Sequence, residues 1–337
     1  MEPVEFSNSY PTHFIISLPG VDNLVLQEEE GKVITKIRNN CNKVTKWEVK
    51  LCGNHVPTIN LALYGGVQSL SASLSQAHCV GTLKQQERDF VTVILRVLKE
   101  IGAFYVVAHG VSSDLFSTLQ ATLGELPYKN DAEAEDSSFK TNRALAEKQK
   151  GKYNPTGECP FNNQLSGEVW RNLVNPAFCA TEGLACMLLH AMAFGQQLCT
   201  GQMTEWRNAW ADPKYQSIGY RVLGYHPGPA FKENKERVVT TARHTDATWV
   251  TILANDGVGG LMVRPPSLGK WIAVQPPFQG ALLVNTGNVM AKASDNFYGA
   301  VCHYVQREEG ARTRVSMPFF YDRAKGDKYH GGGTGGC

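Results

Sequence analysis

Residues 244–253 read His-Thr-Asp-Ala-Thr-Trp-Val-Thr-Ile-Leu, and this stretch joins a polar motif to a strand. From Trp249 to Leu253 it is rich in β-branched and aromatic residues, which favour extended backbone. Just before that run, His244 and Asp246 lie two residues apart, so on a strand both side chains leave the same face. Similar short runs, separated by Gly, Pro, Asn and Asp turns, extend from Tyr220 to Phe320. The pattern predicts a β core of the closed sandwich or jelly-roll type.

The β-prone runs define the middle of three regions that we expect to form one structural domain. Residues 1–215 are predicted to form a helical and β region that packs on the core, with an irregular edge-strand or capping arm up to about residue 55. Residues 216–325 form the predicted core, and residues 326–337 a flexible glycine-rich tail. Apolar spacing predicts helices over Gln85–Ile101, Ser113–Leu123 and Asn175–Leu198, and a strand at Phe104–Val107. The polar stretch 130–154 is predicted to be a loop or a poorly packed helix.

A metal site is predicted from His244, Asp246 and His303. Two imidazoles and one carboxylate are the donor set typical of non-haem Fe(II) oxygenases, which keep positions open for a cosubstrate and O2. His303 follows far enough along the chain to return on another strand of the core. A His-x-Asp pair alone is more often an ordinary surface or core pair, and the distal histidine favours the metal interpretation.

Arg314 and Ser316 form a second polar motif, again two residues apart and on one face of a predicted strand. A guanidinium beside a hydroxyl is a good receptor for a carboxylate, because its planar fork matches the two oxygens. Together with the metal ligands, this pair points to a bound organic acid beside the metal.

The composition excludes several classes of protein. Hydrophobic residues make up 42% of the 337 residues and charged residues 19%, with a net charge of +2. These values are ordinary for a soluble enzyme, and no basic patch indicates nucleic-acid binding. We expect no membrane span and no signal peptide, and hence a cytoplasmic protein. The nine cysteines are scattered without a CxxC pair, which favours reduced thiols.

Residues from about 55 to 323 resemble the plant- and fungal-type Fe(II)/2-oxoglutarate-dependent dioxygenases, which include isopenicillin N synthase. The motifs that carry the resemblance are Val56–Leu61, Gly102–Val111, His244–Asp246, Gly259–Val263, Gly269–Pro276, Asn285–Asn288, His303–Val305 and Arg314–Phe320. Their order and spacing make the signal strong, although each motif alone is weak. Two departures are Asn288, where the family usually has Asp, and Tyr304, where it usually has Arg.

The resemblance implies an α+β fold with a double-stranded β-helix (jelly-roll, cupin-like) core and flanking helices. It implies Fe(II) on His244, Asp246 and His303, with 2-oxoglutarate and O2 as cosubstrates and ascorbate as a candidate reductant. The far carboxylate of 2-oxoglutarate would bind Arg314 and Ser316. Tyr225 is a further candidate for that contact, since the family's Asn-x-Tyr motif stands here as Leu223-Gly224-Tyr225.

The expected activity is oxidation of a small molecule of specialised metabolism by a monomer. Hydroxylation, desaturation and oxidative ring closure all remain open, because one fold supports each of them. Candidate substrate contacts are Arg264, Phe320, Trp170 and Arg171. Arg264 in the cavity would favour an anionic or amino-acid-derived substrate. The alternatives are an oxidase of the isopenicillin N synthase type that does not consume 2-oxoglutarate, and a catalytically silent binding protein on the same fold.

Overall fold

The computed structural model describes residues 14–16, 21–29, 32–39, 49–51, 56–123, 140–156, 167–230, 232, 235–266, 268–274, 276, 280–308, 312–324 and 326–329. Most of the predicted glycine-rich tail, from residue 330 onward, lies outside the described residues. The chain divides into two compact units, residues 1–57 and 58–337, and each is described by itself. The boundary expected at residue 216 stays a prediction.

The first unit contains strands, within the stretch predicted as an edge-strand or capping arm. β2 (Val21–Glu29) and β3 (Lys32–Asn39) pair as antiparallel neighbours, and β1 (Phe14–Ile16) pairs with β4 (Val49–Leu51). Apolar residues recur in both longer strands and are interleaved with charged ones. Because charged and β-prone residues are mixed, the sequence indicated an edge strand here but not the bounds or the pairing of these strands.

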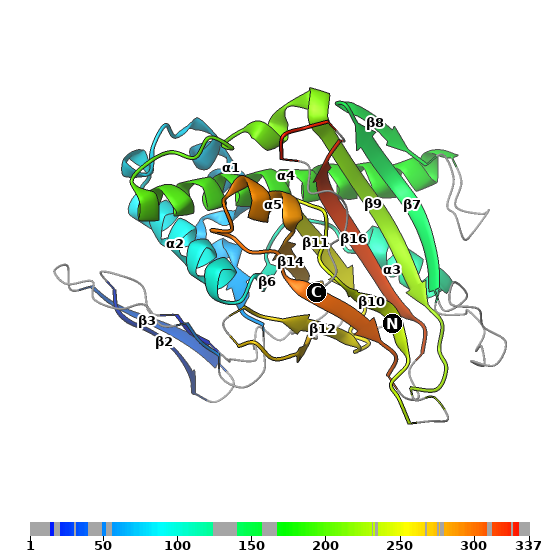
Figure 1. Cartoon of the computed structure of the whole chain (residues 1–337). Helices are drawn as coiled ribbons and strands as arrows, with labels where there is room; N and C mark the ends of the chain where they lie inside the picture. Colours follow the sequence, from blue (N-terminus) through cyan, green and yellow to red (C-terminus); the bar gives the residue numbers. More distant parts are fainter. Residues whose placement is uncertain are drawn as a thin grey trace. The chain divides into compact units, whose positions relative to one another are not determined.

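Two sheets and their covering helices form the second unit (Figure 1). The large sheet has the order β5-β6-β14-β11-β16-β9-β7-β8, and the small sheet the order β10-β15-β12-β13. The strands of the large sheet are β5 (Thr58–Asn60), β6 (Ala103–Val107), β7 (Lys140–Gln149), β8 (Lys152–Pro155), β9 (Gln216–Tyr225), β11 (Val250–Asn255), β14 (Leu282–Thr286) and β16 (Arg314–Arg323). Those of the small sheet are β10 (Val239–His244), β12 (Leu261–Arg264), β13 (Ile272–Val274) and β15 (Cys302–Gln306).

The fold is mixed α and β, as expected from the sequence. Each short β-prone run from Tyr220 to Phe320 forms a strand, and β10 ends at His244, which the two-residue spacing to Asp246 placed on a strand. The pairing of the described strands does not close into a single barrel, because the two sheets share no hydrogen-bonded strand. The prediction of a mixed fold with a β core is therefore confirmed, but that of a closed structure is not.

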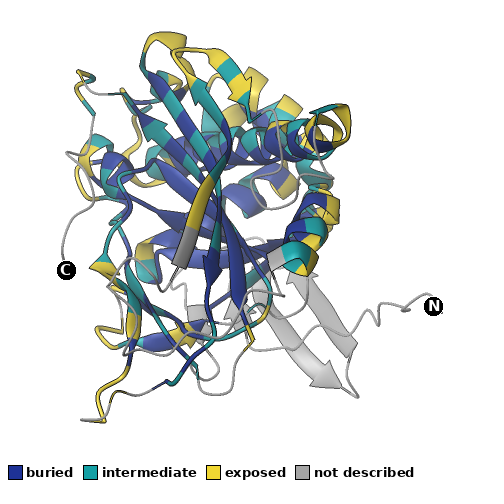
Figure 2. Ribbon diagram, turned by 90° about the vertical axis from the view of Figure 1, so that its right-hand side faces the viewer, coloured by how far each residue is buried: buried dark blue, intermediate teal, exposed yellow. Residues whose placement is uncertain are grey.

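Helices cover one face of the large sheet, where α4 packs on β7, β8, β11 and β16 and lies beside α1, α2 and α3 (Figure 1). The helices are α1 (Gly66–Gln76), α2 (Gln85–Glu100), α3 (Asp114–Leu123), α4 (Gly167–Thr200) and α5 (Asn288–Ala293), with 3-10 turns η1 (Leu61–Tyr64), η2 (Val80–Thr82), η5 (Ala209–Ala211) and η6 (Pro213–Tyr215). The central strands and the inner faces of these helices are buried (Figure 2). By length and composition alone α4 could cross a membrane, but 67% of its most apolar window is buried within the protein, as in a core helix.

Gly102 joins α2 to β6 at a point where only glycine fits. Its φ is 77°, and an added Cβ would lie 2.1 Å from Cγ2 of Val301, which precedes β15. A left-handed backbone and this close approach both exclude larger side chains. The glycine therefore lets helix α2 end against the segment that carries His303.

The polar stretch 130–154 contains a hairpin, so the loop or helix prediction was wrong for its described part. β7 pairs along β9, and β8 returns on β7. β8, at the edge of the sheet, alternates exposed and half-buried positions, and β7 is polar at most positions, so the hairpin carries weak apolar signal. Residues 130–139 lie outside the described part of the chain.

The described cysteines are not all reduced. Cys79, Cys179, Cys186 and Cys199 are free thiols, as expected, whereas Cys302 is disulfide-bonded. The prediction of reduced thiols was therefore wrong for Cys302.

Candidate metal and cosubstrate site

The two candidate imidazoles lie side by side because their strands pair. β10 runs antiparallel to β15, with His244 opposite His303 after a register shift, and the two ring centroids are 4.3 Å apart. Each Nδ1 lies against the carbonyl oxygen two residues earlier, at 2.8 Å from Ala242 O and 3.1 Å from Val301 O. A carbonyl can only accept, so both Nδ1 atoms carry the proton. In both rings Nε2 is then the nitrogen suited to a metal.

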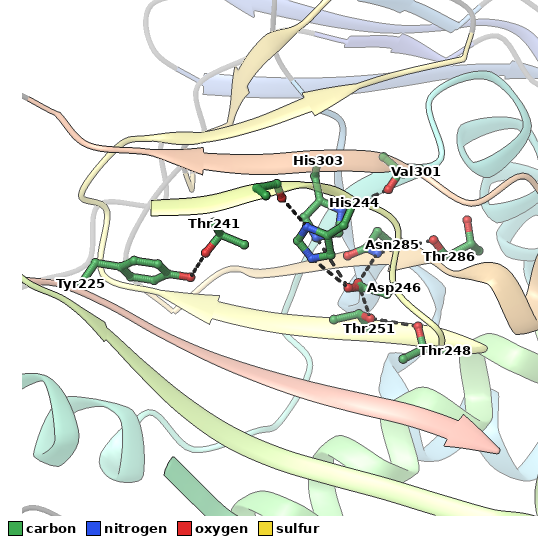
Figure 3. Close-up of polar contacts among 11 residues, drawn as sticks. Tyr225, Thr241, His244, Asp246, Thr248, Thr251, Asn285, Thr286, Val301 and His303 are labelled. Atoms are coloured by element: carbon green, nitrogen blue, oxygen red, sulfur yellow. Dashed lines mark hydrogen bonds and ion pairs between the residues drawn. The ribbon is translucent and has the colours of Figure 1, made fainter. Parts of the chain in front are cut away.

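Asp246 completes the cluster from just beyond the end of β10, and not from the strand itself as the spacing predicted. Its Oδ1 lies 3.7 Å from Nε2 of His244 and 3.6 Å from Nε2 of His303 (Figure 3). Ligand atoms that share an ion at about 2.0–2.2 Å lie roughly 3–4 Å apart, and these distances fit that range. The donor set and its spacing therefore suit a transition-metal ion, with one side left to further ligands.

The second oxygen of Asp246 is held by the large sheet. Oδ2 accepts hydrogen bonds from Thr251 Oγ1 at 2.7 Å and from Asn285 Nδ2 at 3.0 Å (Figure 3). Burial alone would raise the pKa of Asp246, but His303, these two donors and His244 together hold that pKa below its ordinary value. The carboxylate is thus ionised and aimed by residues from β11 and β14.

The segment that leads into α5 fixes the backbone at Asp246 and Thr248. Asn288 N donates to Asp246 O at 2.7 Å, and a Cβ on Gly287 would come within 2.6 Å of Asp246 O and of Thr248 O. The glycine is required for this close approach. Residues 285–288 therefore support Asp246 through both its side chain and its main chain.

Arg314 and Ser316 lie on β16, buried at 5% and 1% exposure. Nη1 of Arg314 donates to Ser316 Oγ at 3.3 Å. The guanidinium carbon lies 5.0 Å from the ring centre of Tyr225, the residue opposite Arg314 on β9. The phenol oxygen of Tyr225 lies 3.4 Å from Thr241 Oγ1, which donates to it (Figure 3). The three residues predicted to bind a carboxylate are therefore in contact.

Arg314 has unmet hydrogen-bonding capacity. Its Nε is buried without a hydrogen-bond partner, and the guanidinium forms no ion pair with any residue that the structure describes. A buried cation without a counter-ion is costly, and a bound anion removes that cost. The arrangement fits a carboxylate ligand.

One cavity of about 170 Å³ joins the His244–Asp246–His303 cluster to Arg314. The inner faces of both sheets line it, with Leu223, Leu253 and Leu283 from the large sheet and Leu261 and Val263 from the small one. Its walls are mainly apolar with a few polar groups, as is typical of small-molecule sites.

Among the predicted substrate contacts, the structure brings only Phe320 into this cavity. Arg264 is exposed at the end of β12, where its guanidinium stacks on Trp271 at 5.8 Å. Trp170 is buried in α4 with its indole nitrogen 3.2 Å from Thr156 Oγ1, and Arg171 is exposed on the same helix. None of these three lines the cavity.

Besides Thr241, four polar residues at this site were not predicted from the sequence: Asn142, Arg221, Thr251 and Asn285. Arg221 could have been found by alternation, since it precedes Leu223 and Tyr225 by steps of two on β9. Asn142 comes from the unexpected hairpin. Nothing in the sequence alone marks the other two as partners of Asp246.

Comparison with known proteins agrees with this geometry. Residues 217–323 match the family model described as the 2OG-Fe(II) oxygenase superfamily. This part of the chain is a 2OG-Fe(II) oxygenase domain. It includes β9 to β16, and with them the cluster, Arg314 and the cavity walls.

Curated relatives of this oxygenase domain come from plants and fungi. The chain is 39% identical over 98 residues to feruloyl CoA ortho-hydroxylase 2 of Arabidopsis thaliana, and 37% identical over 101 residues to a 2-oxoglutarate-Fe(II) type oxidoreductase of Aspergillus fumigatus. These matches cover 29% and 30% of this chain, but only 26% and 29% of the relatives' own lengths. A longer match, 25% identical over 69% of this chain and 73% of the relative, is to gibberellin 2-beta-dioxygenase 1 of Pisum sativum.

Solved structures share the fold of the oxygenase domain and its surroundings. The Arabidopsis thaliana dioxygenase for auxin oxidation 1, in complex with 2-oxoglutarate, is 21% identical with a TM-score of 0.56 over 81% of this chain and 94% of its own. The dioxygenase for auxin oxidation in rice is 21% identical with a TM-score of 0.53 over 81% and 85%. A full-length Neurospora crassa protein, in complex with alpha-KG, is 19% identical with a TM-score of 0.56 over 80% and 86%. At these identities the likeness shows the fold alone.

Proposed function

We propose that this protein is an Fe(II)- and 2-oxoglutarate-dependent oxygenase that oxidises a small molecule. The observation that carries the proposal is the shared cavity, which has the His244–Asp246–His303 cluster at one place and the uncompensated Arg314 at another. We also propose that the two sheets are the two halves of a double-stranded β-helix, because their inner faces enclose this cavity.

Each polar residue then has a distinct role in binding. His244 and His303 would present Nε2, and Asp246 would present Oδ1, while Thr251 and Asn285 hold its other oxygen. Three ligands on one side leave the opposite side for the 2-oxo acid group and O2. When bound, Fe(II) with 2-oxoglutarate activates O2 to oxidise a C–H bond, and 2-oxoglutarate is converted to succinate and CO2.

Arg314 and Ser316 would bind the far carboxylate of 2-oxoglutarate. The hydroxyl of Ser316 is already within reach of the guanidinium, and the ring of Tyr225 supports its face. A fork-shaped cation selects a carboxylate by two parallel hydrogen bonds. The walls are mainly apolar, so a small and mainly apolar substrate suits the remaining space.

An anaerobic titration of the metal-free protein tests the proposal. We expect one Fe(II) per chain, and 2-oxoglutarate binding that is lost in Arg314→Gln, each measured by calorimetry. His303→Ala should lose the metal, whereas His78→Ala, which changes a histidine outside the cavity, should keep it.

The outcomes separate the alternatives. Absence of Fe(II) binding by the wild-type protein would exclude an iron enzyme and favour a silent binding protein. Fe(II) binding without 2-oxoglutarate binding, or substrate oxidation without succinate formation, would favour an oxidase of the isopenicillin N synthase type.

A further inference from the structure

Arg221 is a second cation in the cavity, and the proposed metal and cosubstrate leave its charge uncompensated. It lies on β9 with Leu223 and Tyr225, and all three side chains line the cavity. On a strand, positions two apart share a face, so this is the inner wall of the large sheet. Arg221 forms no ion pair with a described residue.

Strand register separates Arg221 from Arg314. Arg314 lies opposite Tyr225, four residues from Arg221, which is about 13 Å along a strand. On β16, Phe320 lies opposite Thr251 of β11, the residue that holds Asp246. Phe320 also lies opposite Gly219 of β9, two residues from Arg221. Arg221 is therefore nearer to the metal end of the cavity, and Arg314 lies at the opposite end.

The guanidinium of Arg221 is oriented by a neighbour. Its Nε donates to Asn142 Oδ1 at 2.8 Å, from the adjacent strand β7. This bond leaves the two terminal nitrogens without a hydrogen-bond partner among the described residues. A guanidinium held by its Nε presents these nitrogens as a pair, which is the geometry that binds a carboxylate.

The charged residues that the structure describes along the cavity include no carboxylate that could compensate Arg221. Asp246 is the only carboxylate among the described residues that line it, and the metal would bind that group. The far carboxylate of 2-oxoglutarate would compensate Arg314. Arg221 then remains as a partly buried cation with no anion, beside the apolar side chains of Leu223 and Phe320.

We propose that Arg221 binds the carboxylate of the substrate, and that the substrate is a small organic acid with an apolar body. The acid would place its carboxylate on Arg221 and its apolar part along Phe320, toward the metal. This inference rests on the proposed function, because it assigns Arg314 to the cosubstrate. It differs from an anion site at Arg264, which does not line the cavity.

Anaerobic calorimetry on the protein loaded with Fe(II) and 2-oxoglutarate tests the inference. The probes are phenylacetate, hexanoate, the neutral phenylacetamide, and phenyl phosphate. We expect the acids to bind more tightly than the amide by about 10- to 100-fold, the range of a charge-assisted hydrogen bond. Arg221→Gln should abolish this preference, and Arg221→Lys should restore part of it.

Two controls keep the test specific. Arg143→Gln removes an exposed cation from β7 without changing the cavity lining and should leave acid binding unchanged. Arg221→Gln should bind Fe(II) and 2-oxoglutarate as the wild type does, which also shows that it is folded.

Several results would overturn the inference. These are equal binding of acid and amide, no binding of either acid, preference for phenyl phosphate, or weaker 2-oxoglutarate binding in Arg221→Gln. Failure of the wild type to bind Fe(II) or 2-oxoglutarate would instead reject the proposed function itself.

Discussion

The His244–Asp246–His303 cluster and the Arg314 end of the cavity both carry polar groups, but only the cluster has its hydrogen bonds supplied by the protein. Asp246 has two donors on Oδ2, and both histidine rings are held at Nδ1. Arg314 has a single side-chain acceptor, Ser316, and a buried Nε without a partner. The difference indicates that the cluster is preorganised by the protein, whereas the cation depends on its ligand for compensation.

Asp246→Ala should have the largest effect, because it removes a metal ligand from a preorganised cluster. We expect metal-dependent activity to fall by more than the roughly 10- to 100-fold that loss of an outer hydrogen-bond partner costs. Circular dichroism should show an unchanged fold. Wild-type-like activity of this variant with excess Fe(II) would contradict the metal assignment.

Arg314→Gln should weaken 2-oxoglutarate binding by roughly 30-fold or more, because truncating one partner of a buried charge pair costs about 2–5 kcal/mol. Without ligand the variant should melt no lower than the wild type, since an uncompensated buried cation is removed. Calorimetry and thermal melting measure the two effects. Arg312→Gln, which changes an exposed arginine two residues earlier, is the control for 2-oxoglutarate binding.

Thr251→Val tests how far the outer contacts hold the cluster. Loss of the 2.7 Å hydrogen bond to Asp246 should lower Fe(II) affinity by about 10- to 100-fold, and leave 2-oxoglutarate binding to the metal-loaded protein nearly unchanged. Thr122→Val removes a helix hydroxyl that bonds to Thr118 O and serves as control. Equal Fe(II) affinity in both variants would mean that Asp246 does not need this contact.

Ser316→Ala should have the smallest effect. It removes one neutral hydrogen-bond partner worth about 1 kcal/mol, so 2-oxoglutarate affinity should fall by about fivefold. Fe(II) affinity should not change. A loss as large as that of Arg314→Gln would mean that the hydroxyl, and not the cation, dominates carboxylate binding.

The local sequence pattern was sufficient to predict which side chains lie on the same face of one strand. The alternation on β16 predicts that Arg314 and Ser316 share a face, and the structure places both in the cavity. The same rule explains why Arg264 does not line it. Val263 points inward, and a step of one residue along a strand turns the next side chain to the other face.

Edge strands and long-range contacts were harder to predict. The hairpin of β7 and β8 carries many charged residues, so its sequence shows no clear alternation of apolar and polar positions. The contact by which Asn142 orients Arg221 could therefore not be predicted. Trp170 fills the core beneath α4, where its aromatic bulk contributes to packing and not to the cavity.

The sequence by itself determined the residue types of the cluster, the carboxylate receptor and the β core, because each depends on spacings of two residues or on a recurring motif. Only the tertiary structure decided that His244 lies opposite His303, that Thr251 and Asn285 aim Asp246, and that Arg221 shares the cavity with Arg314. Those relations join residues on different strands. They depend on register and sheet packing, which no local pattern specifies.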